Sequence, residues 1–416
     1  MDRRTLGFRA NPNLWTAMRL PFLFVLGTVM IDAMGIGLVL PIMPQLIVEV
    51  QGGSLANAAI WGGVLSTAFA TMQFLFGPVL GNLSDAYGRR TVLLVSLFVM
   101  ALDYVVMAVA GSIWLLLLGR IVGGITAATH STAAAFMADV SKPEEKAANF
   151  GLLGAAFGLG FVLGPLMGGL LGEFGTRAPF WAAAGLSAIG CLVGMLVMPE
   201  TVTDENRRPF RWRRANPVGS LQAISALPGI RPLLGVYFLY SISIYVYPAI
   251  WSYFTLERFG WSPQMIGLSL AVYGLGMAAV QGGLIRPATK YLGERKTIVW
   301  GMGIEIFSFM LLAFLTSGTL ALLLIPITAL GAVVTPALQA MMSKATPDSQ
   351  QGELQGVLAA LHALAMIISP LVMTSVFAEF IRSGAPIYLP GAPFLLALML
   401  MLGGFVLFLR PRPETP

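Results

Sequence analysis

The chain has 416 residues, 57% of them hydrophobic and only 11% charged, and its mean hydropathy is +0.80. Soluble proteins carry about 25% charged residues, so this composition excludes a water-soluble fold and indicates a protein embedded in a lipid bilayer. The net charge of +6 does not indicate a nucleic-acid partner, because the basic residues gather at alternate ends of the apolar segments. Such a distribution is a signal of membrane topology.

Twelve apolar segments are long enough to cross a hydrocarbon core, which takes about 20 helical residues. The first is too long for the apolar region of a signal peptide, about 7–15 residues, so we interpret it as a retained helix. The sequence therefore predicts an all-α polytopic membrane protein. The expected helices are 21–48, 57–81, 91–111, 113–139, 146–172, 178–199, 231–256, 263–287, 297–317, 319–344, 351–378 and 388–410.

Basic residues define the orientation of these helices. All but four of the 25 lysines and arginines lie on the side shared by the two termini. Three of the exceptions, Arg177, Arg258 and Arg382, lie on the opposite side, and Arg120 lies inside a helix. The positive-inside rule therefore predicts that both termini are cytoplasmic.

A polar, basic stretch at 200–230 divides the chain into two halves of six helices. We expect a segment 1–20, a bundle 21–199, the linker 200–230, a second bundle 231–410 and a tail 411–416. A weak repeat supports the division, because Met137 and Pro143 recur as Met341 and Pro347, and GRRT at 88–91 resembles GERKT at 293–297. Two parallel repeats predict a substrate site near the middle of the bilayer, between the halves.

Few ionisable residues fall inside the expected helices, and each costs at least about 2.5–3.5 kcal/mol there, so each is a functional candidate. At about 1.5 Å per residue, all but Arg120 lie roughly 13–20 Å from the cytoplasmic helix ends, whereas Arg120 lies roughly 28 Å from its own. The candidates are Asp32, Asp103, Arg120, His130, Glu305 and His362.

Each candidate also has a structural interpretation. Asp32 precedes Gly35 and Gly37 and is either a proton or substrate site or a structural partner of Arg120. Asp103 and Glu305 occupy the third helix of their halves, and each either titrates or bonds a neighbouring helix. Arg120 can hold an acid ionised or bind an anion.

Histidines and aromatic residues give weaker signals. His130 and His362 either relay protons or form neutral bonds between helices. The seventh helix carries Tyr245 and Trp251 among many aromatic residues that could stack on a planar or cationic substrate. Cys191 is the only cysteine, so neither a disulfide nor a cysteine metal site is available within the chain.

Two glycine-rich segments have a conformational interpretation. GNLSDAYGRR, residues 81–90, is expected to be a tight loop in which Asp85 suits the positive end of the next helix. The fifth helix carries glycines at three- and four-residue spacing and the pair Gly164-Pro165, which indicates close helix packing or a hinge.

These motifs resemble a known family. GNLSDAYGRR resembles the loop signature of the major facilitator superfamily, and GLGFVLGPLMGG resembles the fifth-helix motif of its drug/proton antiporters. IDAMGIGLVLPIMP (31–44), GRIVGGITAAT (119–129), PALQAMMS (336–343) and GELQGVLAAL (352–361) are similar to segments of the bacterial tetracycline-efflux pumps. The resemblance runs from about residue 24 to 378.

The resemblance implies a proton-driven antiporter in the inner membrane that exports a drug-like compound by alternating access. It further implies that Asp85 faces the start of the eleventh helix near Gly352, and that Arg89 pairs with Asp139 to lock the outward-open state. By matching motif positions, Asp32, Gln73, Asp103, Arg120 and Glu305 inherit roles in substrate or proton handling. With the two histidines, the expected proton-coupling residues are Asp32, Asp103, Arg120, His130, Glu305 and His362. The expected gating residues are Gly81, Asp85, Gly88, Arg89, Arg90, Asp139, Gly164 and Pro165. The expected substrate-binding residues are Asp32, Gln73, Arg120, His130, Tyr245, Trp251, Gln339 and His362.

The chain also departs from the tetracycline pumps. Met277 stands where they have a histidine, Glu305 stands where they have an aspartate, and the seventh helix lacks their glutamine. We therefore expect an amphipathic aromatic substrate, without requiring a metal chelate, and a partly rewired proton path. The resemblance implies a monomer that uses the proton gradient and no cofactor.

An uptake symporter or a lipid or metabolite transporter of the same fold is the alternative. The fifth-helix motif disfavours it, because that resemblance is to exporters. A membrane-embedded enzyme is excluded by the lack of HExxH and GxSxG motifs, and the lack of a P-loop argues against direct use of ATP.

Overall fold

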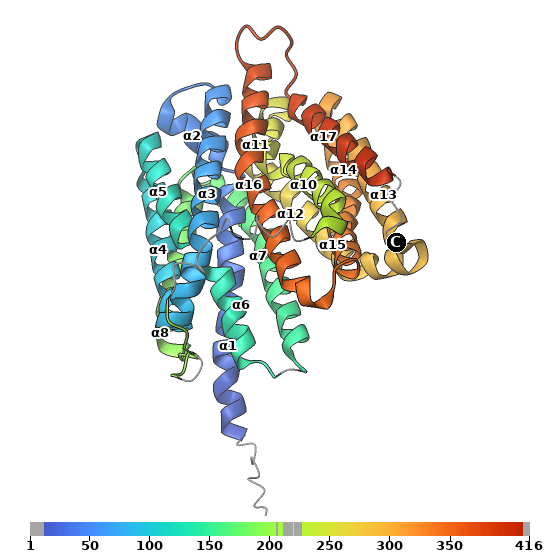
Figure 1. The fold of residues 1–416 in the computed structure, drawn as a ribbon. Coiled ribbons are helices and arrows are strands. Elements are labelled where there is room, and N and C mark those ends of the chain that lie inside the picture. The colour runs from blue at the N-terminus through green and yellow to red at the C-terminus, as the bar shows by residue number, and fades with distance from the viewer. Residues whose placement is uncertain (1–11, 143, 205–206, 211–218, 220–226, 411–416) are drawn as a thin grey trace, which may run out of the picture.

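The computed structural model describes residues 12–410 except 143, 205–206, 211–218 and 220–226. Much of the expected segment 1–20, much of the linker 200–230 and the tail 411–416 lie outside the described residues. Within the described part, all regular structure is helical, and the helices form a blue-to-green half and a yellow-to-red half (Figure 1). This arrangement confirms the expected all-α, two-half fold.

Successive crossings of both halves run in opposite directions, and several crossings consist of more than one helix. The N-terminal half comprises α1 (Pro12–Val39), α2 (Met43–Gln51), α3 (Leu55–Tyr87), α4 (Arg89–Val109), α5 (Ile113–Thr126), α6 (Thr129–Val140), α7 (Lys146–Gly172) and α8 (Ala178–Val197). The C-terminal half comprises η3 (Pro228–Ile230), α10 (Arg231–Ile244), α11 (Val246–Phe259), α12 (Pro263–Ala279), the π-helix η4 (Val280–Leu284), α13 (Ile285–Phe314), α14 (Gly318–Ala329), η5 (Leu330–Val333), α15 (Val334–Lys344), η6 (Asp348–Gln350), α16 (Gln351–Ile381) and α17 (Ala392–Leu409).

Eleven continuous helical segments of the described chain are long and apolar enough to cross a membrane. One of them, Pro263–Phe314, has 52 residues, which is more than twice the length that one crossing needs. Gly293, with φ 77° and ψ 162°, breaks this segment, so it supplies two crossings. The twelve expected crossings are therefore present.

The molecule has two ends along the direction of its helices. One of them, the Gly88 end, carries the α3–α4 turn and the starts of α7, α10 and α16. The other, the Gly52 end, carries the loops at 52–54, 173–177, 260–262 and 382–391. At the Gly52 end Thr176 bonds the Glu49 carboxylate, and Arg177 pairs with it at 3.2 Å. These two partners hold the pKa of Glu49 below its usual range.

The expected loop at 81–90 is mostly helical, which corrects the sequence prediction. Helix α3 continues to Tyr87, and α4 begins at Arg89. Gly88 alone makes the turn, with φ +109°, a conformation that side chains disfavour. Asp85 therefore belongs to the last turn of α3 and does not cap the next helix.

The two halves repeat each other at their breaks as well as in sequence. Gly88 and Gly293 are both at positive φ and precede the third crossing of their respective halves. The fourth crossing breaks between α5 and α6, at 127–128, and the tenth is interrupted by η5. These matched breaks support the internal repeat.

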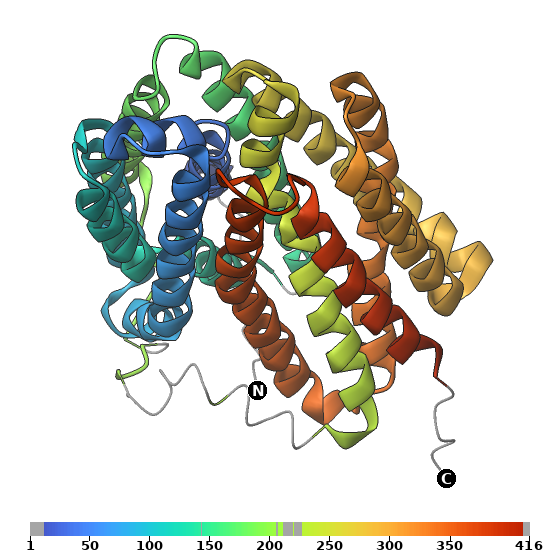
Figure 2. The same cartoon turned by 90° about the horizontal axis from the view of Figure 1, so that it is seen from above.

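Glycines bring the two halves together near the Gly52 end, where α7 meets α12 and α3 meets α16 (Figures 1 and 2). A Cβ at Gly267 would lie 2.2 Å from the Pro165 carbonyl oxygen, and one at Gly169 would lie 2.5 Å from that of Pro263. On the other pair, the Thr67 hydroxyl donates to the Ile367 carbonyl at 2.8 Å. At the α7–α12 contact, only glycine, which has no side chain, allows the two backbones to come this close.

The same helices have open space toward the Gly88 end. A Cβ built at Gly81, Gly154 or Gly158 would meet no other atom within 4 Å, and neither would one at Gly352. The glycines of α7 therefore divide: those from Gly160 to Gly172 serve close packing, as expected, whereas the earlier ones do not. The halves are thus packed together at the Gly52 end.

Gly267→Val is expected to separate the halves at the Gly52 end, because its side chain would overlap the Pro165 backbone, which cannot rotate away. Spin labels at Gly53→Cys and Ser383→Cys, in a Cys191→Ser background, report the distance across this end. We expect pulsed electron paramagnetic resonance to show a longer and broader distance distribution than for the parent.

Gly158→Val is the control, because it adds the same side chain to α7, the helix against which α12 packs, at a position where no neighbour lies within 4 Å. It should leave the distances unchanged. Equal distributions for the two variants would show that the α7–α12 contact does not hold the halves together.

Candidate functional site

In the N-terminal half, Asp103 of α4 and Arg120 of α5 form a buried ion pair. The Arg120 guanidinium bonds Asp103 Oδ2 and lies 5.2 Å from the centre of the Phe69 ring. Asp103 is 5% exposed, and a Cβ at Gly119 or Gly123 would lie within 3 Å of its carboxylate oxygens. The two glycines of α5 therefore make the space that the carboxylate occupies.

The Asp103–Arg120 pair shows that the depth of Arg120 estimated from the sequence is wrong. Arg120 was expected well beyond the aspartates, and Asp32 was its expected structural partner. The Asp103 carboxylate lies level with Gly119 and Gly123 of α5, so Arg120 is at the same depth as Asp103 and not beyond it. Arg120 consequently meets Asp103, while Asp32 bonds another residue.

Asp32 lies half-buried on α1, and its carboxyl group has a side-chain hydrogen bond with Thr129 at the start of α6. Tyr104 lies beside it: a Cβ at Gly35 would fall on the Tyr104 hydroxyl. That hydroxyl is within electrostatic reach of Asp32, Asp103 and Arg120. Tyr104 thus connects the two acids, a role that sequence reasoning missed although Gly35 is one turn from Asp32.

In the C-terminal half, Glu305 of α13 is 1% exposed. The Tyr247 hydroxyl donates to Glu305 Oε2 at 3.0 Å, and a Cβ at Gly331 would lie 2.0 Å from Oε1. No lysine or arginine of the described residues lies within salt-bridge distance of Glu305. Glu305 therefore resembles Asp103 in its glycine-made space but lacks a counter-charge.

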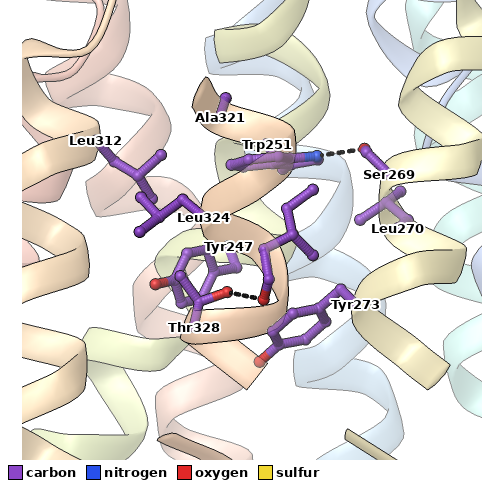
Figure 3. A pocket seen from close by; sticks show the side chains of 10 residues that line it. Tyr247, Trp251, Ser269, Leu270, Tyr273, Leu312, Ala321, Leu324 and Thr328 are labelled. Carbon is purple, nitrogen blue, oxygen red and sulfur yellow. Dashed lines mark hydrogen bonds between the residues drawn. The ribbon is translucent and has the colours of Figure 1, made fainter. Parts of the chain in front are cut away.

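A pocket lies beside Glu305 within the C-terminal half, between α11, α12, α13 and α14. Tyr247, Trp251 and Tyr273 face it (Figure 3), together with Ser269 and Thr328. The Trp251 indole N–H donates to the Ser269 hydroxyl at 2.8 Å. Trp251, expected to bind substrate, is therefore buried inside one half, whereas Tyr247 connects the pocket to Glu305.

The other expected binding residues lie elsewhere. The Tyr245 hydroxyl is 3.2 Å from His362 Nε2, and the His130 ring lies 5.5 Å from that of Phe157; both histidines are exposed in the middle of their crossings. Gln339 bonds Tyr237. Gln73 and Met277 are half-buried, and the roles of all these residues stay predictions.

Most of the expected gating residues lie near Gly88, whereas Gly164 and Pro165 lie in α7 where it packs against α1 and α12. Arg89 bonds Asp85 and Ser84 of α3 and reaches Asp139 of α6 at 3.3 Å. The expected contact of Arg89 with Asp139 is therefore present. Asp85, expected to face α16 near Gly352, is instead bonded to Arg89, because the halves do not meet at this end.

Glu200 caps α4, a role that no pattern within the expected linker 200–230 predicted. Its carboxylate accepts from the backbone N–H groups of Arg89 at 2.8 Å and Arg90 at 3.2 Å. The next residue, Thr201, bonds Asp139 at 3.0 Å. An acid at a helix N-terminus is favoured by the helix dipole, so the linker begins attached to the turn.

The C-terminal half has an ion pair at the equivalent place with reversed charges. Lys344 of α15 pairs with Glu294, next to Gly293, at 2.5 Å. Residues 294 and 344 follow 89 and 139 by the same interval, so an acid and a base have exchanged positions between the halves. Both pairs tie the end of one crossing to the turn before another.

Comparisons with known proteins agree with this geometry. The family model of the Major Facilitator Superfamily matches residues 25–246 and 233–416. The chain belongs to this superfamily. It is a multi-pass membrane transporter and not an enzyme, and among the described residues no three His, Cys, Asp or Glu side chains gather as a metal site would require.

Individual relatives cover most of this superfamily member. It is 45% identical to the class C tetracycline resistance protein of Escherichia coli, over 85% of this chain and 89% of that one. It is 39% identical to the class G protein of Vibrio anguillarum, over 86% and 91%. The crystal structure of the human organic anion transporter MFSD10 matches 94% of this chain and 99% of its own, with 28% identity and a TM-score of 0.68.

Removal of one member of the Asp103–Arg120 pair should destabilise the fold more than removal of both. Asp103→Asn or Arg120→Gln leaves one buried charge without its partner, which typically costs about 3–5 kcal/mol. The double variant leaves no charge and should recover most of that loss. Thermal unfolding of the purified protein measures the three variants.

Glu49→Gln is the comparison variant, since it breaks an exposed ion pair, worth about 1 kcal/mol or less. If the losses of the two single variants simply add in the double variant, Asp103 and Arg120 do not stabilise each other.

Proposed function

We propose that this transporter is a proton-coupled antiporter that exports an amphipathic aromatic, tetracycline-like compound by alternating access. The relatives named as tetracycline resistance proteins support the substrate class. The observation that carries the proton coupling is Glu305, a carboxyl group 1% exposed with a hydroxyl and no cation beside it.

Physical chemistry gives Glu305 its proposed role. A buried ionised carboxylate without a counter-charge costs several kcal/mol, so Glu305 carries a proton in the arrangement described above. Loss of that proton requires water or a cation to reach it. Tyr247 is the group that must move, because its hydroxyl holds Glu305 Oε2 and its ring separates Glu305 from the neighbouring pocket.

Asp32 is the proposed acid of the substrate site between the halves. It is less buried than Asp103, and its partner Thr129 is neutral, so a cationic or polar part of the substrate can approach it. The charges of Asp103 and Arg120 neutralise each other. Tyr104 lies close enough to be affected when the charge of Asp32 changes, and it is proposed to transmit that change to the Asp103–Arg120 pair. His130 and His362, exposed in mid-crossing, are proposed to line the same path.

In the proposed cycle, substrate enters from the cytoplasm while the halves are packed at the Gly52 end, and its binding is coupled to proton release on the same side. The halves then meet at the Gly88 end, where Asp85 and Arg89 take part in the closing contact. Outside the cell, proton binding releases the substrate. This cycle needs no cofactor, and we propose that the monomer performs it in the inner membrane with its termini cytoplasmic.

Import by the same fold is the competing function. A symporter would bind proton and substrate together, whereas an antiporter exchanges them. Vesicles distinguish the two, because added substrate makes an antiporter release protons and makes a symporter take them up.

Glu305→Gln is expected to abolish substrate-dependent proton release while the protein still binds substrate, since glutamine keeps the size and the acceptor for Tyr247 but cannot titrate. Asp32→Asn should abolish it as well. Proteoliposomes with an internal pH dye and an imposed gradient measure release, and equilibrium binding measures affinity.

Glu379→Gln serves as the control, because Glu379 is exposed and pairs only with Arg382 of the same helix end. Its coupling should equal that of the parent. Undiminished proton release by Glu305→Gln would remove Glu305 from the mechanism, and proton uptake by the parent would identify a symporter.

Export by the parent protein is expected not to depend on a divalent cation, because Met277 replaces the histidine of the tetracycline pumps. A panel of dyes and antibiotics, including tetracycline, should be assayed for gradient-driven efflux with and without Mg²⁺. Met277→His should increase tetracycline export several-fold in the presence of Mg²⁺, with Met310→His, on the lipid-exposed surface, as the control. Strict dependence of the parent on Mg²⁺ would contradict this expectation.

A further inference from the structure

A groove runs along the outer surface of the C-terminal half, between α13 and α17, away from the pocket beside Glu305. Its walls are Val299, Trp300, Gly303, Ile304 and Phe307 of α13 and Phe405 of α17. Trp300 is 65% exposed and Phe307 52%. The groove therefore faces the hydrocarbon core of the membrane.

Helical spacing makes this groove a straight channel. Trp300, Gly303 and Phe307 follow Lys296 at intervals of four, seven and eleven residues, so all four lie on one face of α13. A Cβ at Gly303 would meet no atom within 4 Å, so the missing side chain leaves a notch between two aromatic rings. From Lys296 to Phe307 the channel spans about 16 Å, roughly one leaflet of a core about 30 Å thick.

Three basic side chains lie at the Gly88 end of this channel. Lys296 and Arg295 are exposed at the start of the crossing, and the Arg295 guanidinium lies 5.7 Å from the Phe408 ring of α17. Arg410 follows the end of α17. None of the three has an acidic partner within salt-bridge distance in the described chain.

The N-terminal half uses its equivalent cations differently. Arg89 is occupied by Asp85 and Asp139, and Arg90 donates to the Met195 carbonyl at 2.6 Å. After Gly293 the acid Glu294 is taken by Lys344. Arg295 and Lys296 are consequently left to face the membrane surface, where lipid headgroups lie.

We propose that the α13–α17 groove binds an anionic phospholipid, with its phosphate at Lys296, Arg295 and Arg410 and one acyl chain along Gly303. The occupant is a lipid rather than a second copy of the chain, because the groove faces the hydrocarbon core, is about one leaflet long, and ends in positive charge without an acidic partner in the described chain. Two copies facing each other here would bring like charges together. This proposal does not depend on the transported substrate.

Lipid binding to the delipidated full-length protein tests the proposal. Native mass spectrometry with dioleoyl phosphatidylglycerol or dioleoyl phosphatidylcholine compares two lipids with identical chains and different headgroups. We expect a tightly bound phosphatidylglycerol that phosphatidylcholine does not replace. Each of Lys296→Gln and Arg295→Gln should weaken that binding about fivefold, the factor equivalent to about 1 kcal/mol per cation near a membrane surface.

Gly303→Leu fills the notch and should remove the tightly bound lipid without changing any charge. Gly185→Leu is its matched control, because Gly185 of α8 is also exposed with no atom within 4 Å of a built Cβ. Lys290→Gln, outside the channel face, controls for overall charge. Both controls should bind as the parent does.

Three results would overturn the proposal. They are equal binding of the two lipids by the parent, equal effects of Gly303→Leu and Gly185→Leu, or a dimer that Gly303→Leu converts to monomers. Lys296 and Arg295 are exposed, so Lys296→Gln and Arg295→Gln are expected to fold. Their preference for phosphatidylglycerol can therefore be measured even if Gly303→Leu does not fold.

Discussion

A charge inside a bilayer must have a partner, and both halves of this transporter are arranged around that requirement. Asp103 and Glu305 each occupy a space that exists because a neighbouring helix has glycine there. The halves then differ in how the acid is neutralised. Asp103 has Arg120, whereas Glu305 has only the Tyr247 hydroxyl, so its neutralisation needs a proton. One half thus holds an ion pair, and in the proposed mechanism the other half holds an acid that binds and releases a proton.

Glycine also decides where the halves can touch. The backbones of α7 and α12 approach so closely at Gly169 and Gly267 that no side chain fits between them, which gives a dry, well-packed contact at the Gly52 end. The glycines of α7 nearer the Gly88 end have no neighbour in this arrangement. In the proposed cycle they supply a surface without side chains for a second contact when the halves meet at the Gly88 end, so that one helix serves both states.

Much of this fold could be predicted from the sequence, because crossing a membrane imposes a simple pattern. Apolar length predicted the twelve crossings, and GRRT and GERKT predicted the repeat that Gly88 and Gly293 display. The Asp103–Arg120 pair could not be found that way, since depths counted along straight helices from their expected ends put Arg120 beyond Asp103, whereas the Asp103 carboxylate lies level with Gly119 and Gly123. Glu200 was missed because its partners are backbone groups of α4, and backbone N–H groups leave no trace in a sequence pattern.

Exchange of one acid and one base between the halves has consequences at the Gly88 end. Arg89 bonds Asp139 in one half, and Glu294 bonds Lys344 in the other, so each half keeps an internal tie of the same geometry. At the Gly88 turn, Asp85 and Asp139 bond the Arg89 guanidinium, and the Met195 carbonyl accepts from that of Arg90. Glu200 adds a negative charge there by accepting from the backbone N–H groups of both arginines. At the Gly293 turn the acid Glu294 pairs with Lys344, so Arg295 and Lys296 have no acidic partner among the described residues. The positive surface of the C-terminal half thus follows from the exchange, and an anionic lipid supplies there what Glu200 and Asp85 supply in the N-terminal half.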